Sequence, residues 1–489
     1  MRTFFRKRRQ PDTLAPEFDT PQPIPASGSA PYNAQRRHDP LMPEPSGLRM
    51  DGPMRRHDDR RNGPIVPERS PSAGPDDEMP RFAFPVSNGM RGALVSGIEP
   101  EVSKALREAF TPTRPKKEVN ALFIGRLGTI RRIISAIEEE RAHVVLYGDR
   151  GRGKTSLANA VEQIAVQAGY LPSKLTCSAE MGFEEMFRTL LRRIPAGYYR
   201  GDAGQPYIHG RTTGTFDERL PPGPFTVSQL AEVLDEIAGT HVMLVLDEYD
   251  RLVNEDVKNK LAELIKNLTD KGSPVTLFII GVAENVDQLL GKHPSIQRAL
   301  VAVHLPPMSD REIERIILSG SEVAGITFTP ESRRIIVSLS KGLPYYAQLL
   351  SLHAARGAVA RGSREVQRTD MTEAVKRCAE EAERGLIEAY HRVIGEGHGR
   401  TADVLYLAAQ AQSDAFGSFL QEDLLAVPLQ PGERHPPPEA VASILDQLAG
   451  GPYAVLERVI LPGGHRLRFR NQMMRQFVLL MQAERRGVL

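Results

Sequence analysis

One stretch of the chain reads His143-Val-Val-Leu-Tyr-Gly148-Asp149-Arg150-Gly151-Arg152-Gly153-Lys154-Thr155-Ser156. An apolar run of the kind found in strands leads into a glycine-rich turn, and Lys-Thr then opens a segment with helical apolar spacing. The pattern Gly-x-x-x-x-Gly-Lys-Thr between a strand and a helix is typical of a phosphate-binding loop. A glycine-rich turn that arose by chance is the alternative, and the agreement of loop, strand and helix argues against it.

The chemistry of this loop suits a nucleoside triphosphate. Its glycines let successive backbone N–H groups turn inward around a β-phosphate, which also lies at the positive end of the following helix. Lys154 adds a charge toward the β and γ oxygens, and the Thr155 hydroxyl is placed to bind Mg²⁺. We therefore expect ATP to contact Gly148, Asp149, Arg150, Gly151, Arg152, Gly153, Lys154, Thr155 and Ser156.

A second segment predicts the rest of the site. It reads His241-Val-Met-Leu-Val-Leu-Asp247-Glu248, a continuous apolar run that ends in two carboxylates. Such runs are typical of buried parallel strands, and open α/β sheets place ligands at the carboxyl ends of these strands. Asp247 is expected to hold Mg²⁺, and Glu248 to orient and deprotonate the attacking water. A strand followed by a merely acidic, solvated turn is the alternative.

Composition limits the class of protein. The chain has 489 residues, of which 40% are hydrophobic, and its net charge of +2 gives no global field toward nucleic acid or anionic lipid. Cys177 and Cys378 lie far apart without metal-ligand spacing, which fits a reducing compartment. No apolar run is long enough for a membrane helix, and no apolar stretch follows the basic N-terminus. We expect a cytoplasmic protein that does not enter the membrane.

The composition also divides the chain. Residues 1–95 hold 16 of the 38 prolines without a periodic apolar pattern, so we expect a disordered tail. Its basic cluster Arg6–Arg9 is either solvated or in contact with nucleic acid or an anionic surface. Residues 96–308 are expected to form an ATPase core, 309–395 a helical lid and 396–489 a winged-helix domain.

Within the core, short apolar strands alternate with helical segments, which predicts an α/β fold with a mainly parallel, three-layer sheet. The expected strands are 143–148, 173–178, 242–247, 275–281 and 301–305. The expected helices are 127–141, 154–168, 182–194, 226–239, 255–271 and 295–299. Residues 199–223 are rich in Gly, Thr and Pro and are expected to form a long surface loop.

Beyond the core the periodicity is helical. Ser309 and Asp370 are the expected N-caps, the latter with Glu373 in a capping box. The last part predicts three helices, a hairpin and a final helix, which is the order of a winged helix. These helices are expected at 401–412, 417–426, 438–449 and 472–485, and the hairpin strands at 453–461 and 466–470.

These motifs together resemble AAA+ ATPases of the origin-recognition/Cdc-type initiator and STAND-like group, over roughly residues 105–489. Phe123-Ile-Gly125-Arg126 resembles the box that precedes the first strand and lies near the adenine, which implies nucleotide contacts for Gly125 and Arg126. The stretch Leu277–Asn285 resembles the fourth strand and its sensor tip. Glu284 falls at the polar sensor position, whereas Asn285 is chemically the better γ-phosphate sensor, so both remain candidates.

The resemblance implies two further contacts. Arg298 lies in a stretch that resembles the Ser/Arg box, which implies a charge delivered to the γ-phosphate of a neighbouring subunit, although an ordinary surface arginine is equally compatible. Gly342-Leu-Pro344 resembles the Gly-x-Pro turn with which the lid of STAND ATPases contacts the nucleotide. Initiators carry an arginine about there; this chain has Tyr345, which favours the STAND-like assignment.

The C-terminal segment leaves its partner open. Arg466, Arg468 and Arg470 alternate along one expected strand face and could follow a phosphate backbone. The expected third helix, 438–449, contains no Lys or Arg, which argues against a helix that reads DNA. We therefore expect an ATP-driven conformational switch that recruits a protein partner or forms a homo-oligomer. A DNA-binding protein gated by nucleotide is the alternative.

Overall fold

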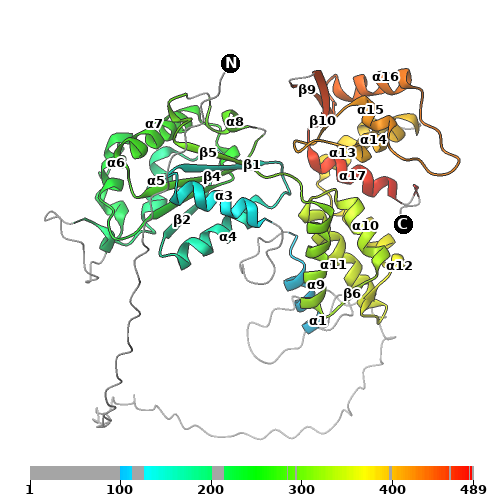
Figure 1. Ribbon diagram of the computed structural model, residues 1–489, viewed down its shortest axis with the longest axis horizontal. Helices are drawn as coiled ribbons and strands as arrows, with labels where there is room; N and C mark the ends of the chain where they lie inside the picture. The colour runs from blue at the N-terminus through cyan, green and yellow to red at the C-terminus, as the bar shows by residue number, and fades with distance from the viewer. Residues whose placement is uncertain are drawn as a thin grey trace, which may run out of the picture. The chain divides into compact units, whose positions relative to one another are not determined.

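A computed structural model describes residues 100–112, 126–200, 214–283, 285–291, 294–395, 399–461, 464–483 and 485–486. The expected tail, Gly125, Glu284 and most of the expected loop 199–223 lie outside these residues. Figure 1 shows the arrangement of the described helices and strands.

A five-stranded parallel sheet forms the first part of the described chain, in the order β2-β3-β4-β1-β5. The strands are β1 (His143–Gly148), β2 (Leu171–Thr176), β3 (Val242–Asp247), β4 (Val275–Val282) and β5 (Leu300–His304). Because all five strands run in one direction, their carboxyl ends meet at one edge, where Gly148 and Asp247 lie two strands apart. The predicted parallel sheet is confirmed.

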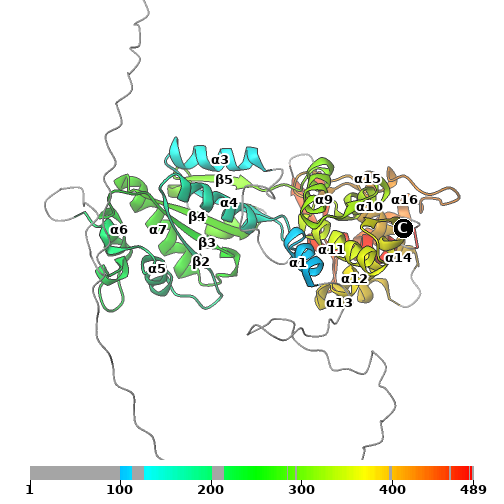
Figure 2. The ribbon, with the colours of Figure 1, turned by 90° about the horizontal axis from the view of Figure 1, so that it is seen from below.

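Helices cover both faces of this sheet, and Figure 2 shows α3 and α5 on opposite sides of it. Alternate strand residues point to opposite faces, so Val144 and Leu146 pack toward α3 (Leu127–Glu138) and α4 (Lys154–Gln167), and Val145 packs toward the other face. On that other face lie α5 (Phe183–Leu191), α6 (Val227–Asp235) and α7 (Glu255–Lys271). The helix expected at 295–299 is instead a single 3-10 turn, Pro294–Ile296.

A second, mostly helical core follows. Its helices are α9 (Asp310–Ala324), α10 (Pro330–Ser340), α11 (Pro344–Ala360), α12 (Arg368–Glu380) and α13 (Arg384–Ile394), with a two-stranded sheet of β6 (Thr327–Phe328) and β7 (Glu365–Val366). Although it precedes the large sheet in sequence, α1 (Pro100–Ala109) packs against α9 and α11. Directly after it, the Phe110 ring lies against Gly320 of α9, where any Cβ would collide with the ring.

Helix caps test two expectations. Ser309 caps α9 and forms a capping box with Glu312, as the sequence predicts. The expected cap Asp370 is wrong, because α12 begins one turn earlier. Gln367 is the cap there, and its backbone N–H donates to the Asp370 carboxylate at 2.8 Å.

The last segment carries the predicted order of three helices, a hairpin and a final helix. Its elements are α14 (Gly399–Gln410), β8 (Ser418–Phe419), α15 (Gln421–Leu425), α16 (Pro438–Ala449), β9 (Leu456–Leu461), β10 (Gly464–Phe469) and α17 (Gln472–Ala483). The predicted start of the helix at 417–426 is wrong. Ser418 and Phe419 instead form a third strand that pairs with β10, and the helix begins at Gln421.

The three hairpin arginines differ in how far they are exposed. Arg468 is 5% exposed and its guanidinium contacts Glu457 at 2.6 Å, while Arg466 lies 3.6 Å from the Asp414 carboxylate. Only Arg470, of the three, is exposed. Among the described residues, the helices are too short or too polar to cross a lipid bilayer.

Candidate functional site

A cavity of about 560 Å³ opens at the carboxyl edge of the large sheet. The loop after β1, the ends of β3 and β4, the start of α11 and the segment after α1 surround it. Its lining comprises Thr111, Pro112, Arg126, Arg150, Gly151, Arg152, Gly153, Lys154, Thr155, Ser156, Asp247, Glu248, Asp250, Arg251, Ile280, Gly281, Val282, Met308, Ile316, Pro344, Tyr345 and Gln348. Most of the residues that the sequence predicted for the site therefore lie around one cavity.

The glycine-rich loop has the backbone that its sequence demands. Gly151 and Gly153 have φ angles of 79° and 87°, in the left-handed region that favours glycine, and Gly153 lies directly before α4. The Lys154 ammonium donates to the carbonyls of Gly148 and Asp149 at 2.9 and 2.8 Å. Burial lowers the Lys154 pKa to about 8, and the nearby carboxylates of Asp250 and Asp149 oppose that shift.

The two predicted carboxylates, Asp247 and Glu248, line the same cavity. Asp247 Oδ1 accepts a hydrogen bond from the Thr155 hydroxyl at 3.3 Å and another from the Glu248 backbone N–H at 3.0 Å. Glu248 has a φ of 54°, a conformation that non-glycine residues rarely adopt and that recurs at active sites. Its carboxylate lies 3.0 Å from the Arg251 guanidinium.

The oxygen ligands offered by Thr155 and Asp247 fit a magnesium ion. Thr155 and Asp247 both line the cavity and offer a hydroxyl and a carboxylate oxygen, the ligands that a hard divalent cation prefers. These two oxygens lie 3.3 Å apart, so the two residues together would hold the ion.

The other end of the cavity is less polar and includes residues that the sequence did not predict. Met308, Ile316 and Tyr345 contribute apolar surface. The Thr111 backbone N–H donates to Gln348 Oε1 at 2.8 Å, which joins the segment after α1 to α11. These partners are separated by 237 positions in the chain, so no local sequence pattern could have indicated them.

Arg126 and Pro344, which the sequence predicts to contact the nucleotide, both line the cavity. Arg126 is 7% exposed and donates to the Pro306 carbonyl at 2.6 Å, and burial lowers its pKa to about 10. Pro344 lies against the loop, since a Cβ built on Gly153 would stand 3.6 Å from the proline ring.

Two predicted catalytic residues do not line the cavity. The Asn285 side chain accepts a hydrogen bond from the Gln288 N–H at 3.0 Å and thereby caps α8 (Val286–Leu290). The structure thus uses Asn285 as a helix cap and does not bring it to the cavity. Arg298 is exposed and lies outside the lining.

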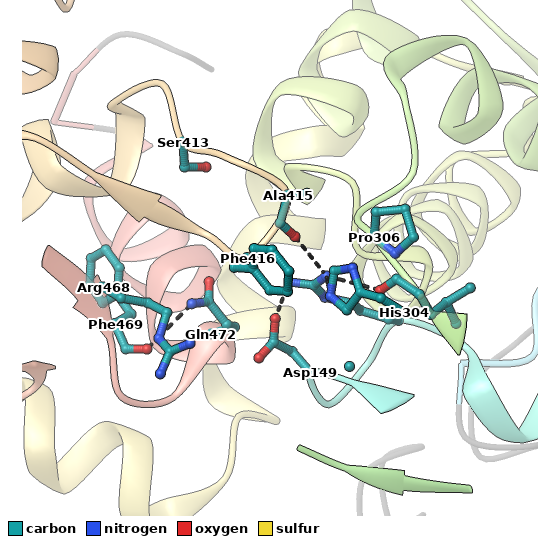
Figure 3. Close-up of polar contacts among 12 residues, drawn as sticks. Asp149, His304, Pro306, Ser413, Ala415, Phe416, Arg468, Phe469 and Gln472 are labelled. Carbon is teal, nitrogen blue, oxygen red and sulfur yellow. Dashed lines mark hydrogen bonds and ion pairs between the residues drawn. The ribbon is translucent and has the colours of Figure 1, made fainter. Parts of the chain in front are cut away.

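The loop also contacts the C-terminal segment. Arg152 is 2% exposed, and its guanidinium donates to the carbonyls of Leu305 at 2.9 Å and Ala415 at 3.1 Å and pairs with Asp149. Figure 3 labels two of these partners, Asp149 and Ala415, at the ends of dashed lines. Beside Arg152 the His304 ring stacks on Phe416, with ring centres 4.5 Å apart (Figure 3).

A further ion pair reaches the loop from the helical segment. The Arg150 guanidinium lies 2.8 Å from the Glu383 carboxylate, directly before α13. Both arginines of the glycine-rich loop are therefore bonded to segments that follow the large sheet.

Many solved structures of other proteins are similar to this chain. They include the Orc1 protein of Aeropyrum pernix, in complex with DNA (16% identity, 78% of this chain, 97% of that chain, TM-score 0.40), Cdc6p from Pyrobaculum aerophilum (14%, 77%, 98%, 0.43) and a Walker-type ATPase of Pyrococcus abyssi (17%, 75%, 98%, 0.45). No match to a curated protein was found.

A family comparison is decisive. The family described as Novel STAND NTPase 1 matches residues 113–393, a range that runs from the segment before β1 to the end of α13. Because this match spans more than half of the sequence and contains both the phosphate loop and the acidic pair, the chain belongs to the Novel STAND NTPase 1 family of nucleoside triphosphatases.

Proposed function

We propose that the protein hydrolyses ATP in the presence of Mg²⁺ and uses the loss of the γ-phosphate to rearrange its helical and C-terminal segments. One observation carries this proposal. The loop that would hold the phosphates is bonded through Arg150 to Glu383 and through Arg152 to Ala415. A change in the phosphates would therefore act directly on contacts to both segments.

Hydrolysis would use both the lysine of the phosphate loop and the acidic pair that follows β3. The Lys154 ammonium would leave its two carbonyl acceptors for the β and γ oxygens, and Thr155 and Asp247 would hold the metal. Bound Mg²⁺ would supply charge neutralisation at the bridge between the β and γ phosphorus atoms. Glu248 would accept a proton from the attacking water, which requires that its carboxylate be released from Arg251.

The moving parts would be the segments 309–395 and 396–489. We interpret the first as a lid, because Pro344 and Tyr345 line the cavity, and the second as a winged helix, because three helices precede its β9–β10 hairpin. The proposed output is recruitment of a protein partner or assembly of a homo-oligomer, in which exposed Arg298 would reach the γ-phosphate of a neighbouring subunit.

Nucleotide-gated DNA binding receives less support. Of the three hairpin arginines, Arg466 and Arg468 face the carboxylates of Asp414 and Glu457, so fewer cations remain for phosphates. Helix α16 contains no Lys or Arg. Salt-dependent duplex binding that Arg470→Glu abolishes would reverse this preference.

Two variants test the proposed hydrolysis. Glu248→Gln should bind ATP within about twofold of the parental affinity but release phosphate at least about a hundredfold more slowly, because the general base is gone. Lys154→Ala should lose ATP binding, since the phosphate charges lose their cation. Exposed Glu263→Gln on α7 is the matched control. Phosphate release from ATP, GTP and CTP measures both the rate and the preference for the base.

Parental phosphate release by Glu248→Gln would place the base elsewhere. Equal turnover of the three nucleotides would refute the assignment of ATP.

A further inference from the structure

Lys174 lies on the edge strand β2 and contacts Asp247 from outside the cavity. Its Nζ lies 3.3 Å from Asp247 Oδ2, 2.9 Å from Glu162 Oε1 and 2.6 Å from Asn159 Oδ1. Glu162 and Asn159 belong to α4, the helix that begins at Lys154. One ammonium therefore joins the candidate metal ligand Asp247 to the helix of the phosphate loop.

The fold dictates this position. Strands β2 and β3 are parallel neighbours in which Lys174 pairs with Val245 and Thr176 with Asp247. Ser173 and Leu175 are buried toward the opposite face, so Lys174 points to the same face as Asp247 and α4. Asn159 and Glu162, three residues apart on α4, share one side of that helix and meet the ammonium together.

The contacts fix the Asp247 carboxylate at both oxygens. Lys174 takes Oδ2, and the Thr155 hydroxyl and the Glu248 N–H take Oδ1. The side chain of Asp247 is 4% exposed, and those of Glu162 and Lys174 are 18% and 22% exposed, so water screens this group only partly. Without the ammonium, the carboxylates of Asp247 and Glu162 would face each other and repel.

We propose that Lys174 is a positioning residue that holds Asp247 with Oδ1 toward Thr155 and thereby sets the affinity of the site for Mg²⁺. The proposal rests on the Mg²⁺-dependent nucleotide binding put forward above. Partners that orient a metal ligand typically contribute about 10- to 100-fold to metal affinity. Lys174 is not among the residues that line the cavity, so its effect reaches the nucleotide through Asp247.

The test measures binding and not turnover. The Kd of a fluorescent ATP analogue is determined in EDTA and along a Mg²⁺ titration for the parental protein, Lys174→Met and Lys174→Arg. Lys174→Met should keep the Kd in EDTA within about twofold and raise the Mg²⁺ concentration of half-maximal effect about tenfold or more. Lys174→Arg should restore the parental value, because it keeps the charge. Exposed Lys266→Met is the control.

A double variant that also removes the charge of Glu162 tests whether repulsion between the two carboxylates causes the loss of Mg²⁺ affinity. In Lys174→Met/Glu162→Gln the repelling carboxylate is gone, so part of the lost Mg²⁺ affinity should return. If Lys174→Met does not fold, Lys174→Gln carries the same expectation, since it is neutral but can still bond to Asn159.

The outcomes separate the two proposals. A parental Mg²⁺ midpoint in folded Lys174→Met, or an equal loss of binding in EDTA and in Mg²⁺, would overturn the positioning role alone. A parental protein whose affinity for the analogue ignores Mg²⁺ would refute the metal dependence itself, and the role of Lys174 with it.

Discussion

The Arg152 guanidinium donates to the Ala415 carbonyl at 3.1 Å, so a residue inside the glycine-rich loop contacts the C-terminal segment directly. The same Nη1 donates to the carbonyl of Leu305, directly after β5, and His304 stacks on Phe416 beside it. The hydrogen bond to Ala415 and the aromatic contact of Phe416 thus involve adjacent residues of the C-terminal segment. Either one can be removed without changing the lysine that would bind the phosphates.

Arg152→Ala should loosen the turn around Ala415. The Phe416, Gly417 and Ser418 amides bond to Asp414, and hydrogen exchange reports how often that turn opens. Loss of hydrogen bonds from a charged group costs about 1.5–3 kcal/mol, so exchange of these amides should rise about tenfold or more. Mass spectrometry of peptides that cover 414–418 measures it.

Phe416→Ala should produce the same increase through loss of the aromatic contact. The control is Arg131→Ala, an exposed position on α3, which should leave these peptides unchanged. Parental protection in Arg152→Ala would mean that the C-terminal segment is held by other contacts.

Arg298→Ala should lower phosphate release about a thousandfold with little change in ATP affinity, because an arginine supplied by a neighbouring subunit acts on the charge of the transition state. Equimolar mixing of Arg298→Ala with Lys154→Ala decides whether the residue acts between subunits. The first variant would supply an intact phosphate site, and the second an intact arginine, so the mixture should recover activity.

Arg315→Ala on α9 is the control, since Arg315 is also exposed. Recovery in the mixture should depend on protein concentration. A mixture as inactive as its two components would argue that Arg298 is an ordinary surface arginine.

Local patterns account for what the sequence predicts well. Strands β1 and β3 have the predicted bounds, because each is a continuous apolar run that ends at the residues of its motif. The loop and the acidic pair meet because parallel strands bring their carboxyl ends to one edge.

Contacts between distant segments could not be predicted in this way. Thr111 meets Gln348, and Arg152 meets Ala415, only after the helical and C-terminal segments have packed. Lys174 reaches Asp247 through the register of β2 against β3, which the apolar pattern of either strand does not fix. Phe419 pairs with β10 although the sequence predicts a helix from 417, because this pairing depends on a strand about 50 positions further along the chain.

Gly320→Ala should destabilise the helical core, against the usual trend. Alanine in place of glycine inside a helix ordinarily stabilises by up to about 1 kcal/mol. Here the new Cβ would stand 2.2 Å from the ring of Phe110, which is 1% exposed and has little room to move. Such overpacking costs about 1–3 kcal/mol, so the melting temperature should fall. Gly357→Ala on α11 is the control, since its nearest contact would be 3.6 Å away, and a rise in both variants would contradict this account.

The large sheet should become less stable as the pH decreases, because of His143. The Leu277 N–H donates to His143 Nδ1 at 3.0 Å, so the ring must be neutral there, and burial lowers its pKa from 6.5 to about 4. Between these two values the unfolded chain binds a proton that the folded chain refuses, so the free energy of unfolding decreases as the pH falls from about 6.5 to 4. The total is on the order of 3 kcal/mol. His143→Asn keeps an acceptor for Leu277 but cannot titrate, so urea unfolding followed by circular dichroism should give a flatter pH profile. Exposed His241→Asn should keep the parental profile, and a parental slope in His143→Asn would assign the acid sensitivity to other groups.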